Sequence, residues 1–311
     1  MKRGVLMIDA ETCTDGYNED WKIELRENLS SAIIGTQMDK ELSTNIGAVY
    51  ACYAPAFLYK YYSDSNLLHW NAVKNNAMWY SSAVKFNDVF DCDIFVDEKA
   101  IFQSIIDTSP EMKRVRKGSA VWLDFKRKSY KATKQLQQMF DDMKGQVGIS
   151  CLSELDNSLL MWAHYANNHR GFCVEYDLLK ISKRLNFTPI PVIYSDKKIS
   201  VQSLFPKSLE EYVTKLVIEA ISTKSTDWNY EKEWRIIRDT KACGDKWSEG
   251  EQGALLPMIK PASIILGCEA TISFQAVVEA YCKEKQINLY KMEKDRHLYK
   301  LNKKLLLSFD I

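Results

Sequence analysis

Two glutamates and an arginine alternate with other residues in the segment WNYEKEWRII, residues 228–237. If this segment is a β-strand, Glu231, Glu233 and Arg235 project from one face, and the aromatic and apolar residues between them project from the other. Two carboxylates so placed can divide catalytic work, since one can stabilise positive charge while the other orients a hydroxyl or a nucleophile. The competing interpretation is a surface strand with ordinary ion pairs, which add little to stability.

A second polar segment, SELDNSLLMWAHYANNHRGFCVEYD, covers residues 153–177. It predicts a short helix carrying Trp162 and His164, followed by an exit loop with Arg170. An arginine at a helix end can hold a phosphate or a carboxylate, whereas His164 is also compatible with an ordinary core histidine. The spacing HYANNH is not HExxH and no third ligand stands out, so the segment does not predict a zinc site.

Two early segments, FLYKYY (57–62) and MWYSS (78–82), read as strands rich in aromatic residues. The second ends in a pair of serines, Ser81 and Ser82. The polar turn after them has two interpretations. Asn87 and Asp88 can shape the loop through Asx-type hydrogen bonds, or the acids of the turn can hold a divalent metal for nuclease chemistry, although no His or Glu completes such a site. The acids concerned are Asp88, Asp91 and Asp93.

The elements that must position these residues mix strands and helices without strict βαβ alternation. Further strands are expected at 147–152, 171–176, 192–194, 234–237, 263–266 and 287–290, and helices at 67–74, 159–166, 209–220 and 272–283. This order favours an α+β fold, with a mixed, mostly antiparallel sheet flanked by helices. We expect one such domain over residues 54–311.

Residues 1–53 read as an N-terminal helical extension. Its apolar positions recur at helical spacing, which requires a partner surface on the core or on a second subunit, as in a homo-oligomer. They are Trp21, Leu25, Leu29, Ala32 and Ile33.

The composition is that of a globular protein, with 46% hydrophobic and 27% charged residues among 311. Lysine and arginine (42) nearly balance aspartate and glutamate (41), so bulk charge does not favour nucleic acid or membrane. The eight cysteines form no CxxC pair, and no segment is long and apolar enough for a signal core or a membrane span. We expect a cytoplasmic protein without a membrane contact.

One local charge asymmetry stands out between Lys113 and Lys134, where nine basic residues face the single acid Asp124. Trp122, Phe125 and Tyr130 are interleaved with them, a mixture that single-stranded nucleic-acid grooves use for phosphate attraction and base stacking. The other interpretation is a solvated helix face whose aromatic residues point to the core.

Six motifs in order make the chain resemble a widespread bacterial family, domain of unknown function 2971, over about residues 57–300. They are LYKYY (58–62), WYSSAVKFNDVFD (79–91), GISCLSE (148–154), MWAHYANNHRGFCVEYD (161–177), WNYEKEWRII (228–237) and ILG (265–267). The family name implies no activity.

The layout is also similar to the ADP-ribosyltransferase fold, in which a first strand anchors NAD, a second carries aromatic-Ser-Ser/Thr and a later one carries the catalytic glutamate. This resemblance implies that Glu233 is catalytic, with Glu231 before it as in the ExE variant and Ser81 orienting Glu233. The block WAHYANNHRG has no counterpart there, and the first strand lacks the expected His or Arg. The implied NAD-binding residues are Tyr59, Lys60, Tyr61, Tyr80, Ser82, Asn87, Trp162, His164 and Arg170.

From these residues we expect an ADP-ribosyltransferase-like enzyme that uses NAD as substrate to modify a macromolecular target, in the manner of a toxin or a phage-defence effector. The alternative is a non-catalytic recognition or sensor module of bacterial defence that binds nucleic acid or protein, with residues 113–134 as the nucleic-acid contact.

Overall fold

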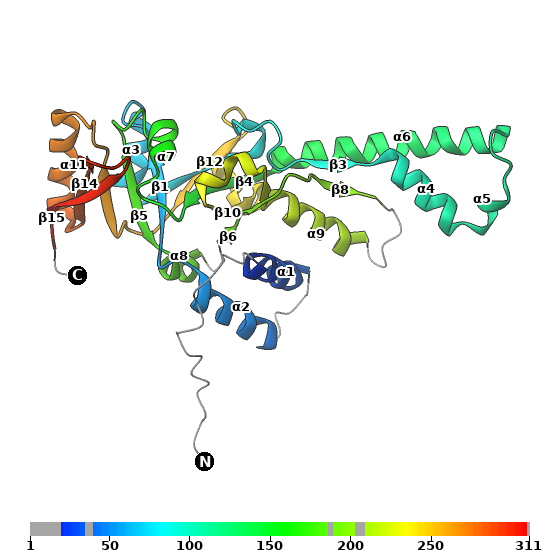
Figure 1. Ribbon diagram of the computed structural model, residues 1–311, viewed down its shortest axis with the longest axis horizontal. Coiled ribbons are helices and arrows are strands. Elements are labelled where there is room, and N and C mark those ends of the chain that lie inside the picture. Colours follow the sequence, from blue (N-terminus) through cyan, green and yellow to red (C-terminus); the bar gives the residue numbers. More distant parts are fainter. Residues whose placement is uncertain (1–19, 35–39, 186–188, 203–208, 310–311) are drawn as a thin grey trace, which may run out of the picture.

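The computed structural model describes residues 20–34, 40–185, 189–202 and 209–309, and this part of the chain has the expected α+β architecture. Its main sheet is mostly antiparallel, with a parallel pairing between β13 and β14, and helices flank it (Figure 1). The strands of this sheet are β1 (Phe57–Tyr62), β2 (Ala77–Ser82), β4 (Val147–Ser153), β5 (Phe172–Asp177), β6 (Ile190–Pro191), β10 (Glu233–Asp239), β11 (Trp247–Ser248), β12 (Gly253–Pro257), β13 (Ser263–Leu266), β14 (Asn288–Lys294) and β15 (Leu301–Leu307).

Two small parallel pairs accompany the main sheet: β3 (Ile94–Val96) with β8 (Ile199–Val201), and β7 (Ile193–Tyr194) with β9 (Thr223–Lys224). The α-helices are α1 (Asp20–Ile34), α2 (Lys40–Tyr53), α3 (Leu67–Lys74), α4 (Glu98–Thr108), α5 (Pro110–Arg114), α6 (Ala120–Met143), α7 (Leu159–Tyr165), α8 (Leu178–Leu185), α9 (Leu209–Ile221), α10 (Thr240–Cys243) and α11 (Ile272–Lys285). Short 3-10 turns are η2 (Ala83–Lys85), η3 (Lys144–Gln146), η4 (Thr226–Glu231) and η5 (Gly244–Lys246).

Strand β4 is the branch point of the main sheet. One edge pairs with β10 along its whole length, from Val147 to Ser153. The other edge is shared: β2 pairs with Gly148 and Ile149, and β1 pairs only at Ser153. The sheet therefore forks between β1 and β2, and the backbone of β4 between these two pairings has no neighbouring strand on that edge.

The two N-terminal helices dock on this same chain. Leu25 of α1 is fully buried and packs in a cluster with Leu29, Ile46 and Ile190, and Figure 1 shows α1 and α2 together below the sheet. The apolar residues of the predicted extension thus pack against the core of the same chain. The side chains of 32 and 33 lie outside those described. Division of the chain into an extension and one domain stays a prediction.

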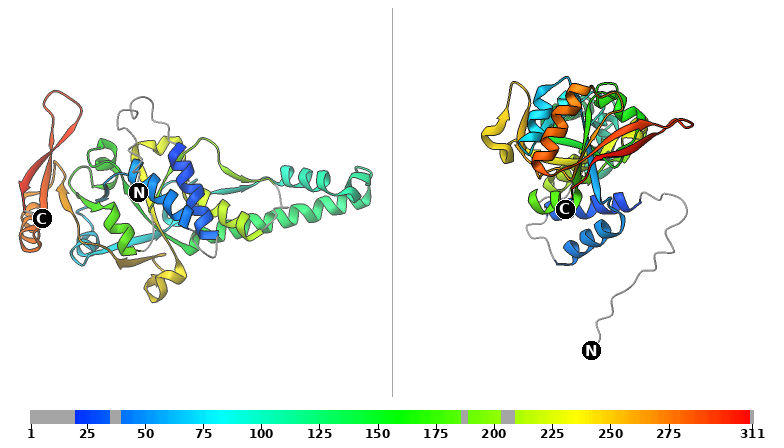
Figure 2. Two further views of the ribbon diagram at one scale, coloured as in Figure 1. Left: turned by 90° about the horizontal axis from the view of Figure 1, so that it is seen from below. Right: turned by 90° about the vertical axis from the view of Figure 1, so that its left-hand side faces the viewer.

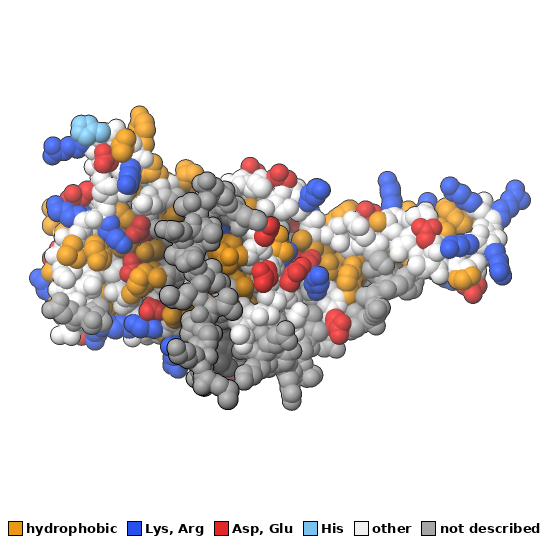
Figure 3. Space-filling model, turned by 60° about the horizontal axis from the view of Figure 1, so that its bottom comes forward, with side chains coloured by type: hydrophobic (Ala, Val, Ile, Leu, Met, Phe, Trp, Pro, Cys, Tyr) orange, Lys and Arg blue, Asp and Glu red, His pale blue; other side chains and the backbone are white. Residues whose placement is uncertain are grey.

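Helices α4, α5 and α6 form an arm that projects from the body of the molecule (Figures 1 and 2). Each helix starts at a polar cap: Asp97 accepts hydrogen bonds from two backbone N–H groups of α4, and Ser109 and Ser119 each accept one from α5 and α6. Apolar residues of β3, β8 and α9 cover the root of the arm. Lys and Arg side chains surround its far end (Figure 3).

The described part of the chain contains no helix long and apolar enough to cross a bilayer. Its cysteines, which are all but Cys13, are free thiols.

Candidate active site

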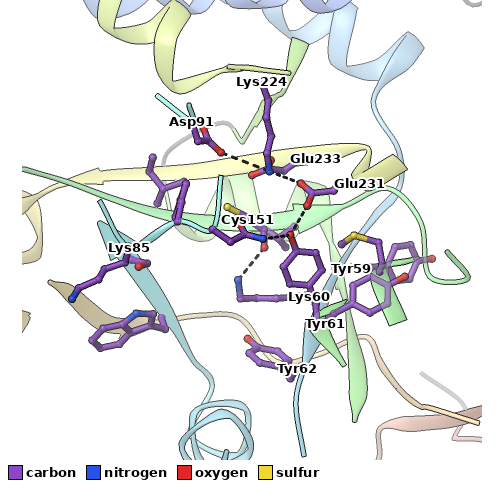
Figure 4. Close-up of a pocket in the computed structure, with 18 of the residues that line it drawn as sticks. Tyr59, Lys60, Tyr61, Tyr62, Lys85, Asp91, Cys151, Lys224, Glu231 and Glu233 are labelled. Atoms are coloured by element: carbon purple, nitrogen blue, oxygen red, sulfur yellow. Dashed lines mark hydrogen bonds and ion pairs between the residues drawn. The ribbon is translucent and has the colours of Figure 1, made fainter. Parts of the chain in front are cut away.

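A cavity of about 420 Å³ opens at the fork of the sheet. Its walls come from β1, β2, β4 and η2, and from the segment 224–233 (Figure 4). Segments far apart in the sequence thus meet here. The sequence-predicted residues that line this site cavity are Tyr59, Lys60, Tyr61, Ser81, Asn87, Glu231 and Glu233.

Lys60 occupies the gap between β1 and β2. Its ammonium donates to the carbonyl oxygen of Cys151 at 2.9 Å, on the stretch of β4 that lacks a strand partner. It lies 5.8 Å from the centre of the Tyr62 ring and forms no ion pair within the described chain. Burial lowers the pKa of Lys60, opposed by nearby Cys151 and Glu233. An ammonium with spare donors in an aromatic-lined cavity is suited to bind an anion.

Arg235 ties the back wall of the cavity into a buried ion-pair network. Its guanidinium makes two hydrogen bonds to the carboxylate of Asp91, at 2.8 and 2.7 Å, and two to that of Glu233, at 2.8 and 3.0 Å. It also donates to the carbonyl of Ile221 at 2.9 Å. Arg235 is fully buried and the two acids nearly so. Arg235 by itself therefore donates a hydrogen bond to each oxygen of Glu233.

Lys224 and Tyr165 complete the network on the side of Glu231. The ammonium of Lys224 donates to Glu231 at 2.6 Å and to Glu233 at 3.2 Å, and it lies 4.6 Å from the centre of the Trp228 ring. The Tyr165 hydroxyl donates to the other oxygen of Glu231 at 2.5 Å. Each carboxylate oxygen can accept two hydrogen bonds, so Glu231 keeps one free acceptor position on each oxygen.

The pKa values of the two glutamates are shifted in opposite directions. Burial raises the pKa of Glu231, and this effect outweighs the stabilisation of its charge by Lys224. Burial also acts to raise the pKa of Glu233, but the charges of Arg235 and Lys224 prevail and lower it to about 2. Glu233 is thus a fixed anion, whereas the pKa of Glu231 lies above its ordinary value. Pairs of acids separated in this way commonly have different roles in catalysis.

Strand β10 begins at Glu233, close to the strand expected at 234–237, so the alternation considered for residues 228–237 does not extend back to Glu231. Lys232 has a left-handed backbone with φ 43°, and Glu231 ends the 3-10 turn η4 instead of belonging to β10. The expectation that Glu231, Glu233 and Arg235 share one strand face is therefore wrong for Glu231. It holds for Glu233 and Arg235, since Trp234 is buried on the opposite face. Lys224 brings the two glutamates together despite this break.

Two residues predicted on β2 do not reach the cavity. Tyr80 is buried in the main core on the other face of the strand, because neighbouring side chains alternate. Ser82 is buried on that same face and donates to the carbonyl of Lys144 at 2.9 Å. Ser81 does line the cavity, but its hydroxyl donates to the carbonyl of Ser82 at 3.3 Å and not to Glu233.

Three residues predicted on and after α7 also lie outside the cavity lining. Trp162 is fully buried, and its indole N–H donates to the carbonyl of Asp156 at 2.7 Å. His164 is exposed beside the Tyr230 ring. Arg170 is exposed in the turn that follows the helix. These positions assign Trp162 to the core and leave Tyr165 as the residue of α7 that contacts the network.

The turn after α7 is unusually constrained. Asn167, Asn168 and His169 all have left-handed backbones, with φ of 46°, 54° and 65°, a conformation that Asn tolerates better than most residues. The turn brings Gly171 so close to β1 that a Cβ there would lie 2.1 Å from the carbonyl oxygen of Tyr62. The block WAHYANNHRG therefore joins α7 to the first strand and supports the cavity wall.

The acids considered for a metal have other partners. Asp91 is bound by Arg235, and Asp93 forms ion pairs with Lys144 and Lys198. Asp88 caps the loop by accepting from the N–H of Phe90 at 2.9 Å, as the loop-shaping interpretation predicts. Across the described ranges, no group of three or more His, Cys, Asp or Glu side chains is arranged to hold a metal ion.

Several residues of the cavity lining and of the ion-pair network were not predicted from the sequence. Lys224 follows an apolar helix without any motif, and its role depends on contacts that form only in the fold. Tyr165 lies within the polar segment 153–177, but the residues predicted for the site from this helix were Trp162 and His164. Trp79 and Lys85 also line the cavity; they belong to the predicted motif WYSSAVKFNDVFD, so the alternation of β2 could have selected Trp79 over Tyr80.

Comparison with known protein families gives a match over part of the chain. Residues 161–236 fit the model of a family described as protein of unknown function (DUF2971). The matched region contains most of α7, the constrained turn, Lys224 and both glutamates, so it supports the resemblance across one side of the cavity. No curated protein and no solved structure matches the chain. The ADP-ribosyltransferase-like layout stays a prediction.

Proposed function

We propose that this protein is an ADP-ribosyltransferase-like enzyme that binds NAD in the site cavity and transfers its ADP-ribose group to a macromolecular target. The observation that carries the proposal is the meeting of Lys60, Ser81 and the pair Glu231 and Glu233 around one cavity. Its volume of about 420 Å³ lies within the range of about 300–1,000 Å³ common for small-molecule sites.

The cavity offers groups for each part of a dinucleotide. Lys60 and the exposed Lys85 form no ion pairs among the described residues and are suited to a pyrophosphate. Tyr62, Trp79 and Phe86 contribute aromatic surfaces to the lining, which suit a planar ring. Anion-binding and ring-binding groups thus line the same space.

Glu231 is the carboxylate assigned to the reaction. Breaking the bond between nicotinamide and ribose leaves positive charge on the ribose, and a nearby carboxylate stabilises that charge in the transition state. The bonding pair leaves with nicotinamide, the ribose carbon binds the nucleophile of the target, and the nucleophile's proton passes to Glu231. Burial raises the pKa of Glu231, which makes its carboxylate a better proton acceptor than an ordinary glutamate. Glu233 positions Lys224 and Arg235 behind it.

The test is release of nicotinamide from NAD, measured by chromatography, with purified protein alone and with a cell extract as the source of target. Glu231→Gln should lower the rate by about 100-fold or more at a temperature where circular dichroism shows that the variant is folded. The exposed Glu251→Gln is the matched control and should retain full activity. No nicotinamide release by the wild-type protein under either condition would refute the enzymatic proposal.

A second candidate is a non-catalytic sensor that binds a nucleotide in the same cavity. It is favoured because the carboxylate of Glu233 already accepts hydrogen bonds from buried neighbours. Both its oxygens are engaged by Arg235 and one also by Lys224, so this carboxylate has little capacity left for a ribose hydroxyl. Calorimetric titration separates the two functions. Binding of NAD without turnover, lost in Lys60→Met, would assign the sensor function.

A further inference from the structure

The end of the projecting arm concentrates positive charge that the rest of the molecule lacks. Residues 110–134 contain nine lysines and arginines but two acids, a net charge of +7, whereas the whole chain has +1. The remainder of the chain therefore carries −6. Such a separation of charge onto one projection creates a local field that attracts polyanions, although bulk composition excludes wholesale attraction.

Most of these cations are available to a partner. Asp124 pairs with Arg127 and Lys128, at 2.6 and 2.8 Å. Lys126 lies over the rings of Trp122 and Tyr130, at 5.3 and 5.4 Å. The remaining cations are exposed and form no ion pair within the described residues. They are Lys113, Arg114, Arg116, Lys117, Lys131 and Lys134.

The cations of α6 follow one face of a helix. Arg127, Lys131 and Lys134 are spaced i, i+4 and i+7, so they form a stripe that rises about 10 Å along the axis. One strand of a duplex presents a phosphate about every 3.4 Å of its axis, so the stripe spans roughly three consecutive phosphates. The other exposed cations surround the turn between α5 and α6, where Gly118 has φ 83°.

The aromatic residues of the arm decide how it would bind. Trp122, Phe125 and Tyr130 all pack around the ring of Phe102, with ring centres 5.5, 6.0 and 6.1 Å away. They hold α4 against α6, as the core-facing interpretation predicts. They are therefore not free to stack on unpaired bases or to anchor the arm in a membrane interface, which leaves attraction to phosphates as the main interaction.

We propose that the end of the arm, residues 110–134, binds the phosphate backbone of double-stranded nucleic acid with little sequence preference. Because the arm projects from the body (Figures 1 and 2), its end can contact a duplex without contact between the duplex and the body. This proposal concerns a surface remote from the site cavity and does not depend on the proposed enzymatic function.

Fluorescence anisotropy with labelled 25-base-pair DNA and RNA duplexes, between 50 and 300 mM NaCl, tests the proposal. The arm variant removes four exposed cations: Arg114→Gln, Arg116→Gln, Lys131→Gln and Lys134→Gln. The matched control removes the same charge elsewhere: Lys241→Gln, Lys246→Gln, Lys283→Gln and Lys300→Gln, all at exposed positions. Thermal unfolding by circular dichroism checks that both variants fold.

Each phosphate contact contributes about −0.9 to the slope of log K against log salt. The arm variant should therefore lose about 3 to 4 units of slope and at least 100-fold in affinity at 100 mM NaCl, while the control changes less than 3-fold. In the wild-type protein, a bound duplex should protect Lys131 and Lys134 from chemical acetylation. Unequal binding of DNA and RNA would identify which duplex is preferred within the same proposal.

Three outcomes would overturn the proposal. The wild-type protein could fail to bind any duplex at 50 mM NaCl, or the control variant could lose as much affinity as the arm variant. Vesicles containing 30% phosphatidylserine could also bind as tightly as the duplexes and compete with them, which would make the arm a membrane contact.

Discussion

Replacing Arg235 by methionine should be among the most destabilising single substitutions in this chain. The guanidinium is fully buried and donates four hydrogen bonds of 2.7–3.0 Å to the carboxylates of Asp91 and Glu233. Methionine removes the charge and leaves two buried anions with Lys224 as their remaining cation. Breaking a buried ion pair from one side costs about 3–5 kcal/mol. At roughly 2–3 °C per kcal/mol for a large domain, the melting temperature should fall by about 6–15 °C.

The assay is thermal and urea-induced unfolding of purified variants. Arg296→Met, at an exposed position, is the matched control and should change the unfolding free energy by less than about 0.5 kcal/mol. Adding Asp91→Asn to Arg235→Met should recover a substantial part of the loss, because one of the stranded charges is removed. A loss below about 1 kcal/mol for Arg235→Met, or no recovery in the double variant, would show that the network does not carry the buried charge as described.

Three further predictions follow from the same structure. Gly171→Ala should destabilise the protein by more than about 3 kcal/mol in urea unfolding, because the new Cβ would lie 2.1 Å from a backbone oxygen, whereas Gly145→Ala has open space and should be nearly neutral. The low pKa of Glu233, about 2 against an ordinary 4.5, contributes roughly 3 kcal/mol of stability above pH 4.5 that is lost as the pH falls toward 2; acid titration of Glu233→Gln should lack this loss. Lys60→Met should weaken binding of pyrophosphate in calorimetry by about 10-fold or more in protein that circular dichroism shows to be folded, and unchanged binding would remove Lys60 from the anion site.

Most of the fold could be predicted from the chain because local periodicity determines it. The predicted helix 67–74 and strand 263–266 coincide with α3 and β13, and the alternation of apolar and polar residues identified most longer elements within a few residues. Strands of two residues such as β6 and β11 carry no periodic signal. They form because a neighbouring strand offers them a partner.

The candidate site was predictable in part, and the limits have distinct causes. Lys60 and Ser81 were predicted from the resemblance to the ADP-ribosyltransferase layout, and both line the cavity. Tyr80 was assigned to the cavity by family resemblance against the alternation of its own strand. Arg235 binds Glu233 and also Asp91, which lies 144 positions before Arg235 in the chain, and Lys224 has no motif at all. Such contacts depend on tertiary packing and leave no local trace.

The branching of β4 explains why these distant residues meet at one place. Ser153 pairs across one edge with Tyr59 and across the other with Glu233, so the first strand and the acidic strand are aligned on the same residue. A shift of β10 by one position would turn Glu233 into the apolar core and expose Trp234, which is fully buried. The ladder therefore holds the carboxylate at the fork where Lys60 fills the missing strand pairing, and the cavity is a consequence of the sheet's topology.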